Sequence, residues 1–211
     1  MPRKRDDAGK CIQAAMTLAA MTGWRNVSLY DIAEEAGLEV ADVVDAVGSR
    51  HGVLRELVRR ADRHMLEAVD QDWRDENVRD RLFTLLMACF DHLKPWREGL
   101  RAVMASAPGD PLAALAFVAG PGMRSMQLVL EAAGVSTAGP LGRMRARALG
   151  LAYIQVFRTF LDDDTEDLSR TMAALDRRLK RLETLAGRLR GNPFERRRLA
   201  PAESDTLAET D

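Results

Sequence analysis

An all-α fold is what this sequence predicts, and three features of its pattern indicate it. Apolar residues recur at three- and four-residue spacing along most of the chain. No alternating apolar run is bounded by hairpin turns, so strand signals are nearly absent. Helix caps and breakers, chiefly Ser, Asn, Gly and Pro, fall between the periodic segments. We expect about nine helices, forming a small N-terminal head and a larger C-terminal bundle.

Composition places the chain among soluble globular proteins. It has 211 residues, of which 46% are hydrophobic and 30% charged, with a net charge of -1. We find no signal peptide and no unbroken apolar run long enough to span a bilayer. Cys11 and Cys89 lie in separate predicted helices and suggest no disulfide framework, so we expect a reducing, cytoplasmic compartment.

The head, residues 1–50, begins with a basic arm and a helix over 7–21, which Thr22-Gly23 breaks. Ser28 is a good N-cap for the next helix, and Asp31 completes a capping-box pattern. Gly37 stands where a helix C-cap is expected. A second short helix over 40–47 places four valines on its inner side: Val40, Val43, Val44 and Val47. Two short helices joined by a Gly-marked turn predict a helix-turn-helix.

The body, residues 51–190, consists of longer helices. Their predicted ranges are 51–72, 77–93, 96–107, 111–133, 141–161 and 168–189. The fourth of them is expected to break or kink at Gly120-Pro121-Gly122, because Pro cannot continue a helix without a distortion. Residues 191–211 lose periodicity, so we expect a disordered tail there.

The stretch IQAAMTLAAMTGWRNVSLYDIAEEAGL, continued by SRHGVLREL, resembles the head of the TetR family of bacterial transcriptional regulators. The resemblance covers about 50 residues specifically, and the rest agrees in length and helical pattern. It implies a TetR-like fold that binds DNA as a dimer through its helix-turn-helix. It also implies a C-terminal domain that senses a small apolar ligand.

A second resemblance involves the C-terminal segment FLDDDTEDLSRTMAALDRRL. It is similar to the lipid-binding accessory protein family of coenzyme-Q (ubiquinone) biosynthesis, which has a TetR-like fold but is not a repressor. This resemblance implies an alternative function, the binding of a lipid or isoprenoid without DNA binding. Both functions stay open at this point.

The charge of the head bears directly on the choice. Residues 11–48 contain one base, Arg25, against six acids, a net charge of -5. DNA affinity comes largely from Lys and Arg at phosphates, so this count disfavours DNA binding. The basic arm can reach a minor groove, although such arms are also typical of solvated termini. The DNA-binding candidates are Ser28, Val40, Ala41, Asp42, Asp45, Arg50, His51, Arg3, Lys4 and Arg5.

Either function requires a cavity in the body. Met-rich and aromatic walls suit flexible apolar ligands, although the same residues are typical of ordinary core packing. The candidate pocket residues are Phe83, Met87, Phe90, Met104, Phe117, Met123, Met126, Leu130, Tyr153 and Phe157.

The last two helices carry more apolar surface than one chain needs, which predicts a homodimer through a four-helix bundle. A monomer whose tail or loops cover that surface is the alternative. The candidate interface residues are Met144, Ala148, Leu151, Met172, Leu175, Leu179 and Leu182.

We find no catalytic constellation and expect neither an enzyme nor a cofactor. His51, His64 and His92 lie on different predicted helices and lack metal-ligand spacing. The acidic run 162–167 lacks the glycine and the distal glutamate of a calcium loop, so we interpret it as a solvated turn. No metal site is expected.

Overall fold

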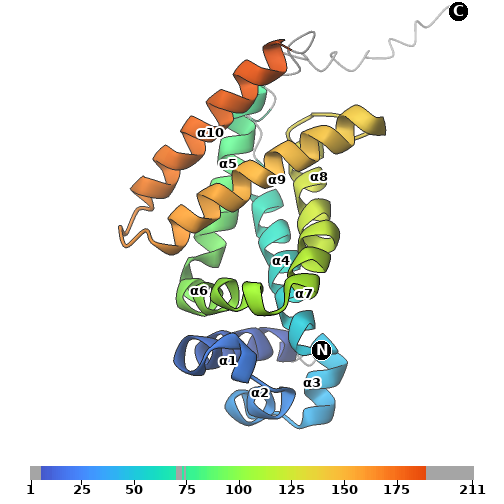
Figure 1. Ribbon diagram of the computed structural model, residues 1–211, viewed down its shortest axis with the longest axis vertical. Helices are drawn as coiled ribbons and strands as arrows, with labels where there is room; N and C mark the ends of the chain where they lie inside the picture. The colour runs from blue at the N-terminus through green and yellow to red at the C-terminus, as the bar shows by residue number, and fades with distance from the viewer. Residues whose placement is uncertain (1–5, 70–72, 74, 189–211) are drawn as a thin grey trace, which may run out of the picture.

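The computed structural model describes residues 6–69, 73 and 75–188, and within them the secondary structure is helical without a strand (Figure 1). The all-α prediction is confirmed. The head contains three helices and a short 3-10 turn, and a fourth helix leads from it into the body. Their bounds are α1 (Asp7–Thr22), η1 (Trp24–Asn26), α2 (Leu29–Ala36), α3 (Val40–Val47) and α4 (Arg50–Glu67).

The rest of the body follows α4 and surrounds its upper part (Figure 1). Its helices are α5 (Val78–Leu93), α6 (Arg97–Ser106), α7 (Pro111–Phe117), α8 (Met123–Ala132), α9 (Gly139–Leu161) and α10 (Ser169–Arg188). Short turns join several of them: η3 (Lys94–Trp96), η4 (Ala107–Gly109) and η5 (Val118–Gly122). The predicted disordered tail and the basic arm lie outside the described residues.

Two helix ends differ by two residues or more from the sequence-based expectation. The helix expected over 51–72 ends at Glu67, because Ala68 closes it with backbone bonds to Met65 and Leu66; residues 70–72 lie outside the described part of the chain. The helix expected to begin at residue 141 begins at Gly139, since Pro140 is well suited to a first helical turn.

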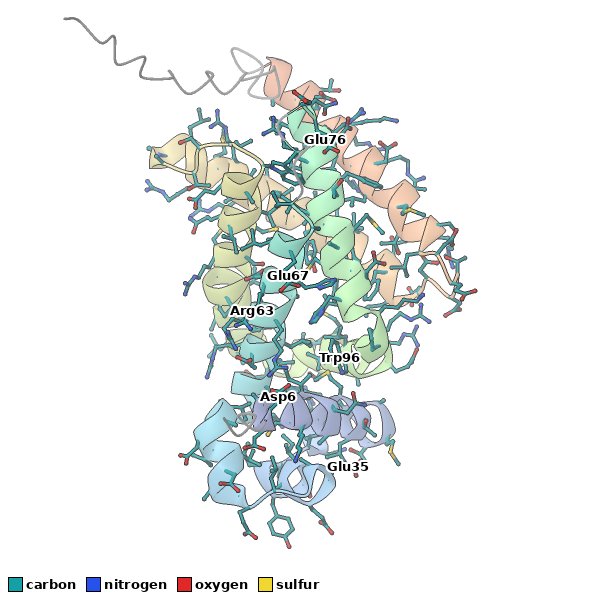
Figure 2. All side chains as sticks on the ribbon, turned by 180° about the vertical axis from the view of Figure 1, so that it is seen from behind. Asp6, Glu35, Arg63, Glu67, Glu76 and Trp96 are labelled. Atoms are coloured by element: carbon teal, nitrogen blue, oxygen red, sulfur yellow. The ribbon has the colours of Figure 1, made fainter. Side chains whose placement is uncertain are left out.

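Head and body share one continuous core. α1 packs across α6 and also against α2, α3 and α4. The crossing is close at Gly99 of α6, where an added Cβ would lie 2.6 Å from the Met16 carbonyl oxygen. Around this crossing Trp96 donates to Gln13 Oε1 at 3.2 Å, and Arg60 of α4 pairs with Asp6 at 2.5 Å. Figure 2 shows Asp6 and Trp96 at this junction, with Glu35 on the side of the head away from the body.

The predicted break at Gly120-Pro121-Gly122 is present as a π-helical turn between α7 and α8. Pro121 has no backbone N–H to continue the α-helical ladder. The stretch Pro111–Ala132 is long and apolar enough to cross a membrane by length and composition, although Arg124 and Glu131 interrupt its apolar sequence. Its second half nevertheless packs into the bundle, with Met126, Val129 and Leu130 buried.

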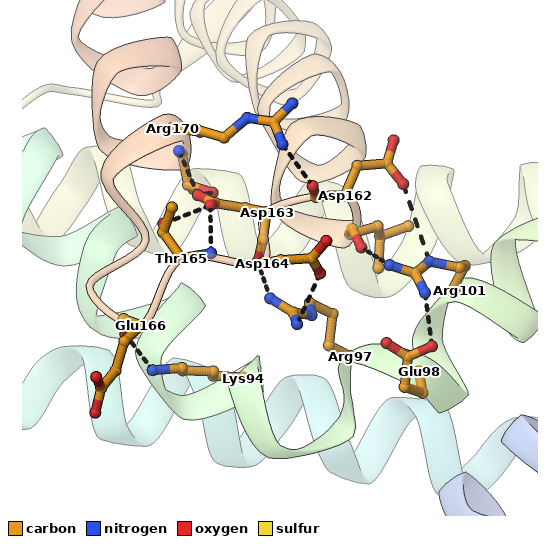
Figure 3. A network of polar contacts seen from close by, with 12 residues as sticks. Lys94, Arg97, Glu98, Arg101, Asp162, Asp163, Asp164, Thr165, Glu166 and Arg170 are labelled. Carbon is orange, nitrogen blue, oxygen red and sulfur yellow. Dashed lines mark hydrogen bonds and ion pairs between the residues drawn. The ribbon is translucent and has the colours of Figure 1, made fainter.

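The acidic turn between α9 and α10 exposes Asp162, Asp164, Glu166 and Asp167, as expected of a solvated turn, but Asp163 differs. Asp163 is fully buried and accepts hydrogen bonds from Thr165 and Thr171 (Figure 3). Arg97 and Arg101 of α6 donate to backbone carbonyls of this turn. The prediction was wrong for Asp163 alone, because the charge pattern does not show that this carboxylate accepts hydrogen bonds inside the turn.

Candidate functional site

The helix-turn-helix has the local geometry that the sequence predicts. Ser28 and Asp31 form a reciprocal capping box, with Ser28 N–H donating to Asp31 at 2.8 Å and Asp31 N–H donating to Ser28 Oγ at 3.2 Å. The hydrogen bond from the Ser28 hydroxyl lowers the pKa of Asp31. Gly37 ends α2 with a φ of +63°, the left-handed region that glycine adopts without strain. The Ser28 hydroxyl is therefore already engaged within the head.

The outward face of α3 carries both acids and exposed apolar side chains. Ala41, Asp42 and Asp45 are exposed, where the DNA-binding prediction places them. The expectation that Val40 and Val44 point inward is wrong, because they are 39% and 44% exposed. An eight-residue helix lying against α1 buries only a narrow stripe, which here consists of Val43 and Val47.

Tyr30 is an exposed head residue outside the predicted DNA-binding set. It lies in the first turn of α2 and is 67% exposed. A signal for it was present in the sequence, because Tyr30 falls outside the inner stripe formed by Leu29, Ile32 and Ala33. A tyrosine there offers an apolar ring and a hydroxyl to a partner.

The two DNA-binding candidates at the start of α4, Arg50 and His51, are partly buried and face the interior of the molecule. Arg50 donates to the carbonyl oxygens of Trp24, Arg25 and Val27 at 3.0–3.3 Å, and its guanidinium lies 5.4 Å from the Trp24 ring centroid. His51 lines a cavity between head and body. Arg50 therefore stabilises the head. A contact with a DNA phosphate would have to use a guanidinium that already donates to three carbonyl oxygens. The predicted arm residues Arg3, Lys4 and Arg5 lie outside the described residues.

A cavity of about 560 Å³ opens between the head and helices α4 to α9. Its volume lies within the usual range for ligand pockets, about 300–1,000 Å³. The structure brings six of the ten predicted pocket residues to its wall: Met104, Phe117, Met123, Met126, Tyr153 and Phe157. The walls are predominantly apolar, which suits an apolar ligand.

The other four predicted pocket residues do not line the cavity. Phe90 is completely buried and stacks on Tyr153, with ring centroids 5.1 Å apart. Met87 and Leu130 are buried in the same core, and Phe83 packs against it. They fill the interior between helices, which is the ordinary core role that the sequence pattern left open for them.

Residues that sequence reasoning missed supply much of the wall. The inner side of α4 contributes Leu54, Leu57, Val58 and Ala61, and the head contributes Trp24. Their apolar spacing was visible in the sequence, but it does not separate a residue facing a cavity from one facing a core. The head and the body therefore both contribute side chains to the wall of this cavity.

The polar groups around this cavity are few. Cys89 and Tyr153 approach each other at 3.7 Å between sulfur and hydroxyl oxygen. Burial raises the pKa of the Cys89 thiol to about 12 and raises that of the Tyr153 phenol, so both are neutral near pH 7. Asp62 of α4 also lines the cavity and accepts a hydrogen bond from the Ser125 hydroxyl.

The predicted dimer residues divide into three groups by their exposure. Leu175 and Leu179 are each only 1% exposed, so they are packed within their own chain and cannot form an interface. Met144 and Leu151 are 49% and 64% exposed on α9. Ala148, Met172 and Leu182 are partly exposed. The outward apolar stripe is therefore carried mainly by α9, because α10 uses its leucines to pack on α9 and α5.

Within the described residues, no group of three or more His, Cys, Asp or Glu side chains is arranged to hold a metal ion. The three histidines are distributed between two regions. His64 and His92 lie near each other, with ring centroids 5.0 Å apart, whereas His51 lies at the cavity. Burial lowers the pKa of His92, which favours its neutral form in this packing.

Comparison with solved structures identifies proteins of the same architecture. A TetR transcriptional regulator from Nitrosomonas europaea is 25% identical, with a TM-score of 0.65 over 82% of this chain and 96% of that one. A TetR transcriptional regulator from Rhodococcus sp. RHA1 is 18% identical, with a TM-score of 0.57 over 83% and 94%. No model of a known protein family matches the chain, and no curated protein matches it. The resemblance to the ubiquinone accessory family gains no support from these comparisons.

Proposed function

We propose that this chain, which has the fold of the TetR-family transcriptional regulators, is a dimeric, cytoplasmic DNA-binding regulator that responds to a small apolar ligand. One observation carries the proposal: the cavity is bounded by head and body at once. Trp24, Arg25 and Arg50 of the head side face the same space as Phe117 and Tyr153 of the body. A ligand there contacts both parts, so occupancy can bias the position of the head.

α4 provides the physical connection. It begins at Arg50, whose side chain holds three head carbonyls, and its middle turns form the cavity wall through Leu57, Val58 and Ala61. A ligand that displaces this wall moves the same rigid helix that anchors η1. Ligand binding and DNA binding would then be linked reciprocally through two positions of α4.

The DNA-facing surface that we propose consists of α3 and the start of α2. Tyr30, Ala41 and Val44 are exposed there. Asp42 and Asp45 can accept hydrogen bonds from cytosine amino groups in a major groove, although they repel phosphates. We therefore expect modest affinity and a weak salt dependence from the head itself, with any stronger phosphate contact coming from Arg3, Lys4 and Arg5.

The experiment is fluorescence anisotropy with a duplex from the DNA upstream of the chain's own gene, compared with random DNA at 50–300 mM salt (about the range over which phosphate contacts weaken). Tyr30→Ala should weaken binding to the upstream DNA at least about 10-fold, the loss of one good contact. Met21→Ala is the matched control, because Met21 is also an exposed head side chain, at the end of α1.

A ligand carrier that does not bind DNA is the second candidate, and the charge of the head favours it. Asp42 and Asp45 are exposed on α3, and the guanidinium of Arg50 donates to backbone carbonyl oxygens. If no duplex binds at 50 mM salt, the regulator proposal is wrong. A lipid or isoprenoid found by mass spectrometry in the purified protein would then support the carrier.

A further inference from the structure

Asp62 is a carboxyl group in the wall of an otherwise apolar cavity. It lies in the middle of α4, beside Val58 and Ala61, and faces the space also bounded by Phe117. The other acid at this cavity, Asp110, lies at the exposed start of α7, where it caps the helix by accepting from Ala113 N–H. No ion pair within 4.0 Å reaches Asp62 from any described residue.

The surroundings of Asp62 leave its charge poorly compensated. The Ser125 hydroxyl donates to Oδ1, and no hydrogen bond from the described residues reaches Oδ2. Burial raises the pKa of Asp62, although the Ser125 hydrogen bond and the more distant charge of Arg124 partly oppose this. The nearby Cys89 and Tyr153 are neutral groups that supply no positive charge. A carboxylate in such a place is costly unless a cation pairs with it.

The arginines that line the cavity do not pair with Asp62. Arg50 is engaged with head carbonyls, Arg25 donates to the Ser106 carbonyl oxygen at 3.5 Å, and Arg147 is exposed on α9. Asp62 is half-buried, and its carboxylate receives a hydrogen bond from the Ser125 hydroxyl and no cation from the described residues. The described wall of the cavity therefore lacks a cation that pairs with the Asp62 carboxylate.

We propose that Asp62 is the head-group site of the cavity and that its ligand is a lipophilic amine, with the ammonium at the Asp62 carboxylate and the hydrocarbon part against the apolar walls. This inference rests on the proposed ligand-sensing function and specifies its ligand class. The ammonium donates to Oδ2, the oxygen that Ser125 leaves open. Because Asp62 belongs to α4, the ligand pairs directly with the helix that joins head and body.

The test is calorimetric titration of the purified full chain with three compounds that share a C12 tail: dodecylamine and dodecanoate below their micelle concentrations, and dodecanol below its solubility limit. We expect dodecylamine to bind at least about 10-fold more tightly than the other two, the effect of one charge-assisted hydrogen bond in an apolar site. Asp62→Asn should remove this preference and leave dodecanol affinity unchanged within about twofold. Acidification toward the raised pKa of Asp62 should weaken dodecylamine binding alone.

Two control variants make the result specific. Asp110→Asn removes the same charge from the cavity rim and keeps its cap, so it should retain the amine preference. Ser125→Ala keeps the carboxylate and should retain the preference as well. If all three amphiphiles bind equally, or dodecanoate binds best, the inference is wrong and the ligand-sensing function stands. If none of the three binds, the cavity is not an apolar-ligand site and both proposals are wrong.

Discussion

At the scale of single residues, the buried Asp163 carboxylate holds the turn before α10. Oδ1 accepts from the Thr165 N–H and hydroxyl, and Oδ2 accepts from the Thr171 N–H and hydroxyl, at 2.5–3.2 Å. Asp163→Asn replaces one acceptor by an amide donor and leaves a buried N–H without a partner. We expect a loss of about 2–3 kcal/mol in the free energy of unfolding, measured by urea denaturation.

The neighbouring Asp164 supplies the matched control. It is exposed, and among the described residues its carboxylate pairs only with Arg97, at 3.3 Å. Asp164→Asn should change the free energy of unfolding by less than about 0.5 kcal/mol, as is usual at a surface site. Equal losses in the two variants would show that Asp163 contributes through charge alone rather than through its four hydrogen bonds.

The same carboxylate predicts an acid limb in the stability profile. Burial alone would raise the pKa of Asp163, but the hydrogen bonds from Thr165 and Thr171 outweigh it and lower the pKa to about 2. A carboxyl whose pKa is depressed by folding stabilises the protein above its unfolded pKa, about 4. That contribution is lost as the pH falls from about 4 to about 2. Urea midpoints at several pH values should fall over this window, and less steeply in Asp163→Asn.

Contacts between individual residues were the part of the site that the sequence predicted least well. The pattern predicted the Ser28 capping box and the Gly37 cap, because those interactions are made within a few residues. It did not predict that Arg50 would turn inward, because its three carbonyl partners lie 23–26 residues away. Long-range hydrogen bonds depend on how helices pack, which local spacing does not specify.

At the scale of helices, the crossing of α6 over α1 depends on Gly99. An added Cβ would lie 2.6–2.9 Å from backbone and Cβ atoms of Met16, which cannot move without shifting the whole of α1. We expect Gly99→Ala to lower the free energy of unfolding by about 3 kcal/mol, the upper end of the usual cost of overpacking. Thermal unfolding followed by circular dichroism measures this.

Gly120 in η5 is the matching control, because a Cβ there meets nothing within 4 Å and its φ is not positive. Gly120→Ala should be neutral or stabilise the fold by up to about 1 kcal/mol, since it restricts the unfolded chain. If Gly99→Ala were equally well tolerated, α1 and α6 would not be in the close contact described above.

Helix positions were more predictable than helix faces. Caps and breakers placed most ends within two residues, including the break at Gly120-Pro121-Gly122. The prediction of how each helix face is used was wrong where a helix is short or has two apolar sides. Val40 and Val44 proved exposed, and Leu175 and Leu179 proved internal. Apolar spacing reports that a surface is buried, but it does not report whether the same chain, a partner or a ligand buries it.

At the scale of the whole molecule, the cavity and the proposed dimer both come from the apolar character of α9. One side of α9 buries Leu149, Val156 and Phe160 in the core. Another side lines the cavity at Tyr153 and Phe157. The third side presents a stripe at three- and four-residue spacing, which consists of Leu141, Met144, Ala148 and Leu151, and Leu151 also borders the cavity. A sequence pattern shows the excess of apolar residues, whereas only the packed structure assigns each side.

The exposed stripe leads to a prediction about assembly. Leu141, Met144 and Leu151 are 49–64% exposed, and such a stripe on a long helix suits a two-fold contact in which α9 meets its symmetry copy. We expect a mass of twice 23.4 kDa by light scattering after size exclusion. Met144→Lys should yield the monomer, because the symmetric contact would bring two added charges together in an apolar interface.

Leu112→Lys is the control for that substitution. Leu112 is 79% exposed on α7, so it adds the same charge to an apolar surface outside the proposed contact. This variant should remain dimeric. If both variants dissociate, the interface extends to α7, and the cavity wall formed by α7 lies beside the partner. If the unmodified chain is already monomeric, the α9 stripe is not a dimer surface, and DNA binding by paired heads loses its structural basis.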